Sequence, residues 1–144
     1  MMLIRLAVLE DLDAIVTLAE SAGPGMTNLP DQRDLLRDKI VQSMETVVAS
    51  AEDSLKGGYL FVQQDLDTNQ VVGCCGILPR VGLERPFYSF RVIRLTHSSQ
   101  ELDKYEPMEA LQMVEEYRGS TEVATLFLRQ EARESCFGSS YPQE

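Results

Sequence analysis

The pattern of apolar and polar positions up to Ala51 predicts a short strand followed by two amphipathic helices. Residues 4–8 favour a strand, and the acidic residues after them suit the first turn of a helix over residues 10–22. After the glycine- and proline-containing segment 23–30, Asp31 is suited to cap a second helix that ends at about Ala51. The apolar stripe of this helix consists of Leu35, Leu36, Ile40, Met44, Val47 and Val48.

Strand patterns dominate the rest of the chain. Residues 59–64 and 70–78 flank a short polar turn and predict a β-hairpin. Residues 70–78 are apolar in both alternating sets of positions, which is typical of a central strand with both faces covered. Residues 86–95 and 122–128 predict two further strands, whereas residues 105–117 suit either a short helix or an ordered loop.

Length and composition indicate a single globular domain of 144 residues. No apolar run approaches the ~20 residues that cross a bilayer, and the start of the chain turns acidic too soon for a signal peptide. We therefore expect no membrane association. The three cysteines, with Cys74 and Cys75 adjacent, suggest neither a disulfide framework nor a zinc site, so we expect a cytoplasmic protein without a bound metal.

The net charge of −10 disfavours nucleic acid as a partner, because phosphates would be repelled. An acidic surface would attract a cationic small molecule. Many cytoplasmic proteins carry this charge for solubility alone, so the charge does not identify a ligand.

Five collinear segments resemble the arginine N-succinyltransferases and cover residues 2 to about 133. They are residues 2–5 with the helix that follows, 25–30, 59–62 with 72–77, 86–91 with 97–102, and 119–120 with 125–128. The resemblance implies an α+β fold of the GCN5-related N-acetyltransferase type. Its mixed, mostly antiparallel sheet would be flanked by helices and truncated after the cofactor-binding strand. Residues 1–144 would then be an incomplete N-terminal acyltransferase-like domain, without the second half of the family's chain.

The resemblance implies transfer of the succinyl group from succinyl-CoA to the α-amine of L-arginine, with release of CoA, in arginine catabolism. Succinyl-CoA would be a co-substrate, and no cofactor would be bound permanently. The family's proton-donor histidine lies in the absent half, so no catalytic residue is assigned, and we expect a fragment with little or no activity alone. An alternative is a non-catalytic acyl-CoA-binding or regulatory module that pairs with a full-length subunit. Homo- or hetero-oligomers would form through an exposed sheet edge.

The resemblance also implies a cofactor-binding set. Leu126 corresponds to the family's succinyl-CoA contact, with Phe127 and Leu128 beside it, although all three also suit a strand core. Arg133 to Gly138 correspond to the loop that binds pyrophosphate through main-chain N–H groups. Cys136 stands where that loop has its first glycine, and a side chain there obstructs close approach of a phosphate.

The substrate-binding candidates are Thr27, Asn28 and Arg91. The first two lie in the loop that often shapes the acceptor pocket in this superfamily, and a plain connector is equally compatible. Arg91 could bind the succinyl carboxylate, and a structural ion pair is the other interpretation. His97, the single histidine, suits a structural role better than catalysis. Cys74 and Cys75 are expected to be small core residues.

Overall fold

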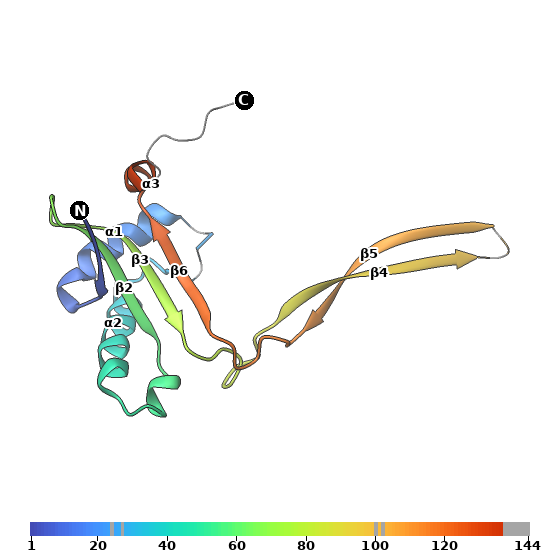
Figure 1. The fold of residues 1–144 in the computed structure, drawn as a ribbon, viewed down its shortest axis with the longest axis horizontal. Coiled ribbons are helices and arrows are strands. Elements are labelled where there is room, and N and C mark those ends of the chain that lie inside the picture. Colours follow the sequence, from blue (N-terminus) through green and yellow to red (C-terminus); the bar gives the residue numbers. More distant parts are fainter. Residues whose placement is uncertain (24, 27, 100, 102, 137–144) are drawn as a thin grey trace. The chain divides into compact units, whose positions relative to one another are not determined.

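The computed structural model describes residues 1–23, 25–26, 28–99, 101 and 103–136. The chain divides into two compact units, one formed by Met1–Pro79 with the residues from Thr121 onwards and the other by Arg80–Ser120 (Figure 1). The separate second unit was not predicted from the sequence. The prediction of one acyltransferase-like domain over residues 1–144 stays a prediction.

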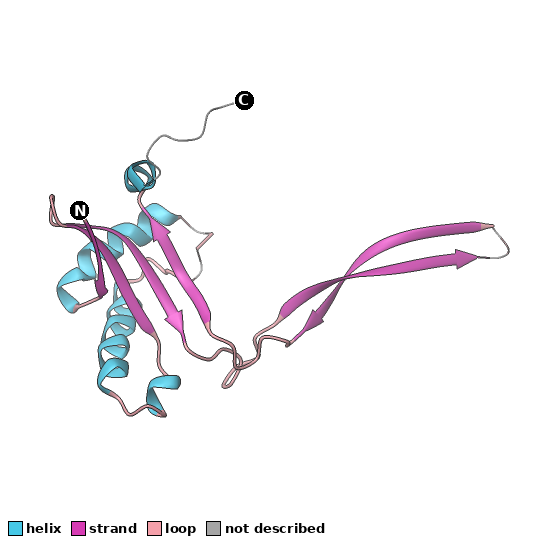
Figure 2. Cartoon of the chain, in the orientation of Figure 1, coloured by secondary structure: helices cyan, strands magenta, loops and turns pink. Residues whose placement is uncertain are grey.

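The first unit is built on a four-stranded sheet in which every neighbouring pair is antiparallel (Figure 2). The strand order is β1-β2-β3-β6. The strands are β1 (Met2–Leu6), β2 (Tyr59–Asp65), β3 (Gln70–Leu78) and β6 (Glu122–Leu128). The predicted hairpin and the last strand are therefore confirmed, and β6 lies at one edge of the sheet.

Two helices, α1 (Leu12–Ala22) and α2 (Arg33–Val48), pack side by side on one face of this sheet. Helix α1 lies against β3 and α2 against β2. The core between helices and sheet contains Ala7, Leu12, Ile15, Leu18, Ala19, Leu29, Leu36, Ile40, Leu60, Val62, Val71 and Cys74. In the part of the chain that the structure describes, no helix covers the other face of the sheet, and Cys75 and Ile77 of β3 are only half-buried there. The expectation that β3 is buried on both faces is therefore wrong.

Helix α2 differs from its predicted form. Its N-cap residue is Gln32 and makes no side-chain capping bond, so Asp31 is not the cap. Leu36 and Ile40 are buried as predicted, but the buried face continues through Ser43 and Thr46, while the other four residues of the predicted stripe are exposed. Ser43 is buried because its hydroxyl accepts a 2.8 Å hydrogen bond from the main-chain N–H of Leu60 in β2.

A short 3-10 turn, η1 (Leu9–Asp11), joins β1 to α1 and is held by a partly buried ion pair. The Arg5 guanidinium donates to both carboxylate oxygens of Asp11, at 2.7 and 2.8 Å. The same carboxylate accepts from the N–H of Val8 at 2.9 Å. Burial opposes ionisation of Asp11, but the hydrogen bonds from Arg5 and Val8 outweigh it and lower the pKa of this carboxyl group. Asp11, one of the acidic residues at the start of the predicted helix, thus holds the turn that leads from β1 into α1.

The second unit contains a two-stranded antiparallel ribbon of β4 (Ser89–Ser99) and β5 (Lys104–Val114). Its pairing runs without a register shift from Ser89 opposite Val114 to Ser99 opposite Lys104. The predicted strand over 86–95 is confirmed in part, since β4 begins and ends later. The helix or loop predicted over 105–117 is wrong, because pairing with β4 overrides the helix-favouring composition of this segment.

Helix α3 (Gln130–Cys136) follows β6 after a single residue. Residues 133–136 of the predicted pyrophosphate loop are therefore helical and not a loop, and Gly138 lies outside the described residues. The predicted binding of pyrophosphate by Arg133 and Gly138 stays a prediction. Helix-favouring residues with no glycine between 129 and 136 account for the early helix start. No helix in the described ranges is long and apolar enough to span a membrane.

Candidate functional site at the β6 bulge

The sheet is irregular where β6 pairs with β3. The register passes from Gly76 opposite Ala124 to Cys74 opposite Phe127, so Thr125 and Leu126 together face the single residue between them on β3. Thr125 has a φ of 57°, a left-handed conformation that β-branched residues rarely adopt. The bulge turns Thr125 toward the helices, where it is buried, while Leu126 is 68% exposed.

Two glycines in β3 make room for the bulged strand. A Cβ atom at Gly76 would lie 3.2 Å from the carbonyl oxygen of Ala124 and 3.3 Å from Oγ1 of Thr125. At Gly73 it would lie 2.8 Å from the carbonyl oxygen of Phe127, which is closer than packed structures allow. Any side chain at Gly73 would therefore push the main chain of β6 away just after the bulge.

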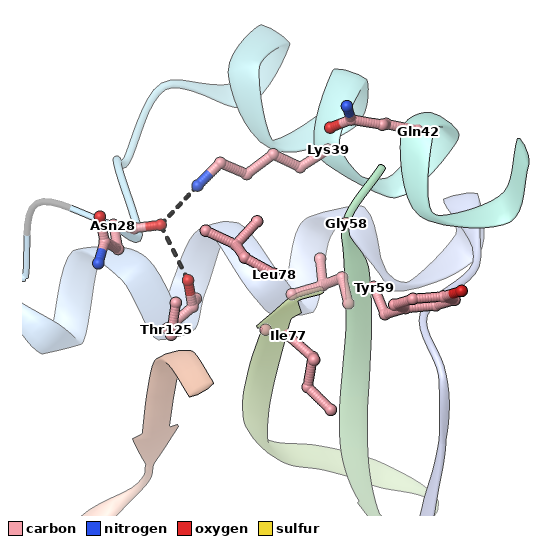
Figure 3. Close-up of a pocket in the computed structure, with 11 residues that line it drawn as sticks. Asn28, Lys39, Gln42, Gly58, Tyr59, Ile77, Leu78 and Thr125 are labelled. Carbon is pink, nitrogen blue, oxygen red and sulfur yellow. Dashed lines mark hydrogen bonds between the residues drawn. The ribbon is translucent and has the colours of Figure 1, made fainter. Parts of the chain in front are cut away.

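A cavity of about 100 Å³ lies beside the bulge, between α2 and the adjoining ends of β2, β3 and β6 (Figure 3). The main-chain carbonyl oxygen of Asn28 accepts two hydrogen bonds there, from Nζ of Lys39 at 2.6 Å and from Oγ1 of Thr125 at 3.1 Å. The bulge, the loop before α2 and α2 itself are thus joined at one point. The cavity is lined by Asn28, Lys39, Gln42, Gly58, Tyr59, Leu60, Gly76, Ile77, Leu78, Ala124 and Thr125.

The charge in this cavity comes from Lys39. Burial lowers the pKa of its ammonium group below the ordinary value for lysine. An ammonium group has three donors, and Asn28 accepts from only one of them. A half-buried cation with unused donors can bind a carboxylate.

The neighbouring thiol does not supply a nucleophile. Burial raises the pKa of Cys74 to about 12, so the group stays a neutral thiol at physiological pH. Its Sγ lies 3.6 Å from the carbonyl oxygen of Thr125. The prediction of a core role is confirmed for Cys74, whereas Cys75 is only half-buried.

On the uncovered face of the sheet, an apolar groove of about 400 Å³ runs along β6 and its neighbours. Its lining includes the three predicted cofactor-binding residues Leu126, Phe127 and Leu128, together with Phe61, Cys75 and Ile77 from the adjacent strands. On its outer side β6 has no partner strand in the described part of the chain, so its main chain can bond a ligand.

Arg133 lies just beyond the C-terminal end of β6, beside Phe127, whose ring packs against the core on the helix side of the sheet. Its Nε donates to the carbonyl oxygen of Leu128 at 2.8 Å, and its guanidinium carbon lies 5.4 Å from the centre of the Phe127 ring. The structure thus brings Phe127, Leu128 and Arg133 together.

The other predicted residues are not all part of this site. Asn28 is, but through its main-chain carbonyl group, and Thr27 lies outside the described residues. Arg91 belongs to the second unit, where its guanidinium pairs with the carboxylate of Glu116. His97 is exposed in the same unit, opposite Glu106 in the register of the ribbon.

Sequence reasoning missed Lys39 and Thr125. A signal existed for Lys39, because it lies three residues after Leu36 and so on the flank of the buried helix face. Thr125 had no such signal. Its unusual backbone follows from pairing with β3, which the sequence of β6 alone does not reveal. Within the described ranges, no group of three or more potential ligands could hold a metal ion.

Comparisons with known proteins show which family the chain resembles. The profile of the family described as "AstA: Arginine N-succinyltransferase beta subunit" matches residues 2–140. An arginine N-succinyltransferase of Photorhabdus laumondii is 40% identical over 89% of this chain and 37% of its own. One from Escherichia coli O17:K52:H18 is 37% identical over 98% of this chain and 40% of its own.

A solved structure is also similar. Subunit AI of the arginine/ornithine succinyltransferase from Pseudomonas aeruginosa has a TM-score of 0.78 and 30% identity, over 91% of this chain and 40% of its own. The predicted fold class is confirmed by this likeness. The chain spans about two fifths of the length of these relatives. On the match over residues 2–140 and these identities, this chain belongs to the arginine N-succinyltransferase family.

Proposed function

We propose that this chain contributes the acyl-CoA-binding part of an arginine N-succinyltransferase, which transfers the succinyl group of succinyl-CoA to the α-amine of L-arginine. The observation that carries the proposal is the bulge in β6, in a chain of this family. It takes Thr125 and Leu126 out of the regular ladder at the edge of the sheet. Family membership supports the acyltransferase chemistry and the choice of substrates.

The reaction sets three chemical demands. The α-ammonium group of arginine loses a proton, and the free amine forms a bond to the thioester carbon. The tetrahedral intermediate carries an oxyanion, which hydrogen-bond donors stabilise. The C–S bond then breaks, and the CoA thiolate takes up a proton. Main-chain N–H groups at the bulged edge of β6 are suited to the second demand.

In this arrangement the pantetheine arm of succinyl-CoA lies in the apolar groove, against Leu126 and Leu128, while the ring of Phe127 between them packs on the helix side of the sheet. A groove of this size is within the roughly 300–1,000 Å³ range of small-molecule sites. Arg133, in the helix that follows β6, keeps guanidinium N–H groups besides the one that bonds Leu128. Those groups would bind a phosphate of CoA.

The cavity beside Lys39 would hold the carboxylate of the succinyl group. At about 100 Å³ it suits a short acyl chain better than a whole arginine. The ammonium group of Lys39 would donate to the carboxylate with the hydrogens that Asn28 leaves free. This contact would distinguish succinyl-CoA from acyl-CoA molecules without a terminal carboxylate.

These 144 residues alone are proposed to turn over slowly or not at all. The single histidine of the printed sequence, His97, lies in the second unit and is exposed. This observation favours a second candidate function, that of a non-catalytic acyl-CoA-binding or regulatory module that pairs with a full-length subunit. We also place the protein in the cytoplasm, where thiols stay reduced.

Calorimetric titration with succinyl-CoA tests the proposal, together with an assay of CoA release in the presence of arginine. We expect saturable binding and slow or undetectable release. Leu126→Glu should weaken binding about tenfold or more, because a carboxylate would enter an apolar groove. Val123→Glu is the matched control, since Val123 is similarly exposed on the same strand and does not line the groove. The proposal fails if succinyl-CoA does not bind, or if both variants weaken binding equally. Binding without release by the chain alone, combined with a change in the rate of CoA release by a full-length relative when this chain is added, would favour the second candidate.

A further inference from the structure

The ribbon of β4 and β5 exposes large apolar side chains in facing pairs. Phe90 is paired with Met113, and Val92 with Leu111, on the same face of the ribbon. These four side chains are 58–69% exposed. Further along the same face, the next rung is the pair Arg94 and Glu109, which form an ion pair at 3.4 Å. We call this surface the Phe90 face.

An isolated two-stranded ribbon is at best marginally stable in water. Neither outer edge of this ribbon pairs with another strand in the part of the chain that the structure describes. A fully buried aromatic side chain removes roughly 150–250 Å² from water and an aliphatic one somewhat less, so the exposed fractions of these four give an apolar patch on the order of 500 Å². Patches of this size mark surfaces that bind another molecule.

The two strands carry opposite charge. Strand β4 has Arg91 and Arg94 and no carboxylate, whereas β5 has Glu106 and Glu109 and a single lysine at its start. On the Phe90 face the charges nearest the apolar pairs are Arg94 and Glu109. A partner for this face must therefore present an apolar pair beside one acidic and one basic group, in crossed positions.

We propose that a second copy of this chain covers the Phe90 face. Two ribbons would stack face to face, related by a twofold axis that runs between them along their length. This axis places β4 of one copy over β5 of the other. Two stacked sheets keep their strand directions within about 30° of each other, so the rungs stay aligned near the centre of the contact.

The stacking is complementary at each rung. Phe90 lies over Met113 of the partner subunit, and Val92 over Leu111 of the partner subunit. At the third rung Arg94 lies over Glu109 of the partner subunit, and the twofold axis repeats each contact. The four charges of the two copies then alternate in sign around a square. The opposite, head-to-tail stacking places β4 over β4 and brings basic strands together, so charge selects the first arrangement.

The size of the contact is consistent with a reversible dimer. Two patches on the order of 500 Å² bury about 1,000 Å² in total, near the lower bound for a specific interface. Because the interface is isologous, each substitution acts twice.

The first test compares dimerisation of two variants by sedimentation equilibrium at several concentrations. The wild-type chain is expected to form an increasing fraction of dimer as its concentration is raised to about 100 μM, where complexes of moderate affinity are populated. Leu111→Glu should weaken dimerisation about 100-fold or more, since it introduces two buried carboxylates into one contact. Met108→Glu is the control, because Met108 is on the same strand and 46% exposed but points to the other face of the ribbon. Far-ultraviolet circular dichroism and thermal melting establish that both variants fold.

A wild-type chain that stays monomeric at every concentration overturns the proposal, and so does a dimer that Leu111→Glu does not weaken. Loss of the dimer in both variants overturns it as well, because the contact would not be confined to the Phe90 face.

The second test places the charge contact between copies. Arg94→Glu alone and Glu109→Arg alone should each lose the dimer, because like charges then face each other at the third rung. Mixing the two variants should recover the dimer, because the third rung of one variant is then acidic on both strands and faces the third rung of the other, which is basic on both strands. Within each variant chain the two strands still carry like charges, so recovery on mixing cannot come from pairing inside one copy. Failure of the mixture to recover a dimer that wild type forms would falsify this stacking.

Discussion

The sharpest consequence of the proposed function concerns Lys39. Its Nζ has one acceptor, the carbonyl oxygen of Asn28 at 2.6 Å, and two hydrogens left for a ligand. Under the proposed function these hydrogens bind the succinyl carboxylate. Replacing Lys39 with methionine removes the cation and keeps a flexible chain of similar length, so apolar packing in the cavity should be largely retained.

The expected magnitude follows from the character of the contact. A hydrogen bond to a charged group contributes about 1.5–3 kcal/mol. Lys39 is only half-buried, so solvent screening places the contribution near the lower limit. Lys39→Met should therefore weaken succinyl-CoA binding roughly 10-fold, at 1.4 kcal/mol per factor of ten.

Calorimetry with two ligands separates this effect from general damage to the site. Butyryl-CoA matches the succinyl group in length but has a methyl group in place of the carboxylate. Wild type should prefer succinyl-CoA, and Lys39→Met should abolish the preference while butyryl-CoA binds as before. Lys56→Met is the control for charge alone, because Lys56 is exposed, pairs with Asp53 and does not line the cavity. An undiminished preference for succinyl-CoA in Lys39→Met would refute this role.

The same preference should depend on pH in one direction. Because burial lowers the pKa of Lys39, the ammonium group loses its proton at a lower pH than an ordinary lysine. Raising the pH through this lowered pKa removes the cation, so the preference for succinyl-CoA over butyryl-CoA should fall. The bound carboxylate favours the charged form and shifts the loss to higher pH in the complex.

Two stability predictions concern the first unit. Ser43→Ala should lower the free energy of unfolding by about 1–3 kcal/mol, because the buried N–H of Leu60 loses its acceptor. Ser54→Ala should change it little, because the hydrogen bond that it removes is a local one, from a half-buried side chain to the carbonyl oxygen of Ala51. Urea titrations of both variants measure this difference, and equal midpoints would contradict it. Asp11→Asn should lower stability by about 1–3 kcal/mol at neutral pH, because Arg5 loses its partner. The folded-state pKa of Asp11 is lowered, so its contribution is complete above the unfolded pKa of about 3.9 and is lost as pH falls through the folded value. The free energies of unfolding of the wild type and Asp11→Asn should therefore converge in acid. A difference between them that stays constant down to low pH would exclude an ionic origin.

The elements that the sequence predicts correctly are those whose local pattern agrees with their packing. Helix α1 buries Leu12, Ile15, Leu18 and Ala19 at helical spacing, and its neighbours in sequence provide clear start and stop signals. The β2–β3 hairpin likewise has strand-favouring residues on both sides of a polar turn. Local preference and tertiary structure lead to the same result in these segments.

The errors arise where pairing over a long distance in the sequence decides the structure. Strand β5 contains Glu106, Glu109, Ala110 and Leu111, a composition that favours a helix, yet it pairs along its whole length with β4. In α2 the apolar residues near the C-terminal end are exposed, while Ser43 is buried because β2 supplies a donor for its hydroxyl. The loop expected over 133–138 came from a motif with two glycines that the sequence only partly matches. None of these outcomes follows from the segment itself.

The bulge shows why the candidate site was only partly predictable. A regular β6 would alternate, with Thr125 on one face and both of its neighbours on the other. Instead Ala124 and Thr125 are both buried, and Leu126 alone turns to the uncovered face. This arrangement requires Gly76 opposite Ala124, where a Cβ atom would crowd the carbonyl oxygen at 3.2 Å. The predicted contact at Leu126 therefore depends on a glycine in another strand.

The bulge also joins the two regions of the proposed substrate site. The cavity that contains Lys39 is lined by Thr125 on the helix side of the sheet, and the groove is lined by Leu126 on the uncovered face, so a ligand held in both would pass over the outer edge of β6 at the bulge. Succinyl-CoA has a matching order of groups, with a carboxylate two methylene groups from the thioester carbonyl and the pantetheine arm beyond its sulfur. A ligand held at both ends would place its thioester at the bulge, where the edge strand has main-chain donors to offer. Displacing β6 should therefore damage recognition of the carboxylate and of the pantetheine arm together, whereas Lys39→Met should damage only the first.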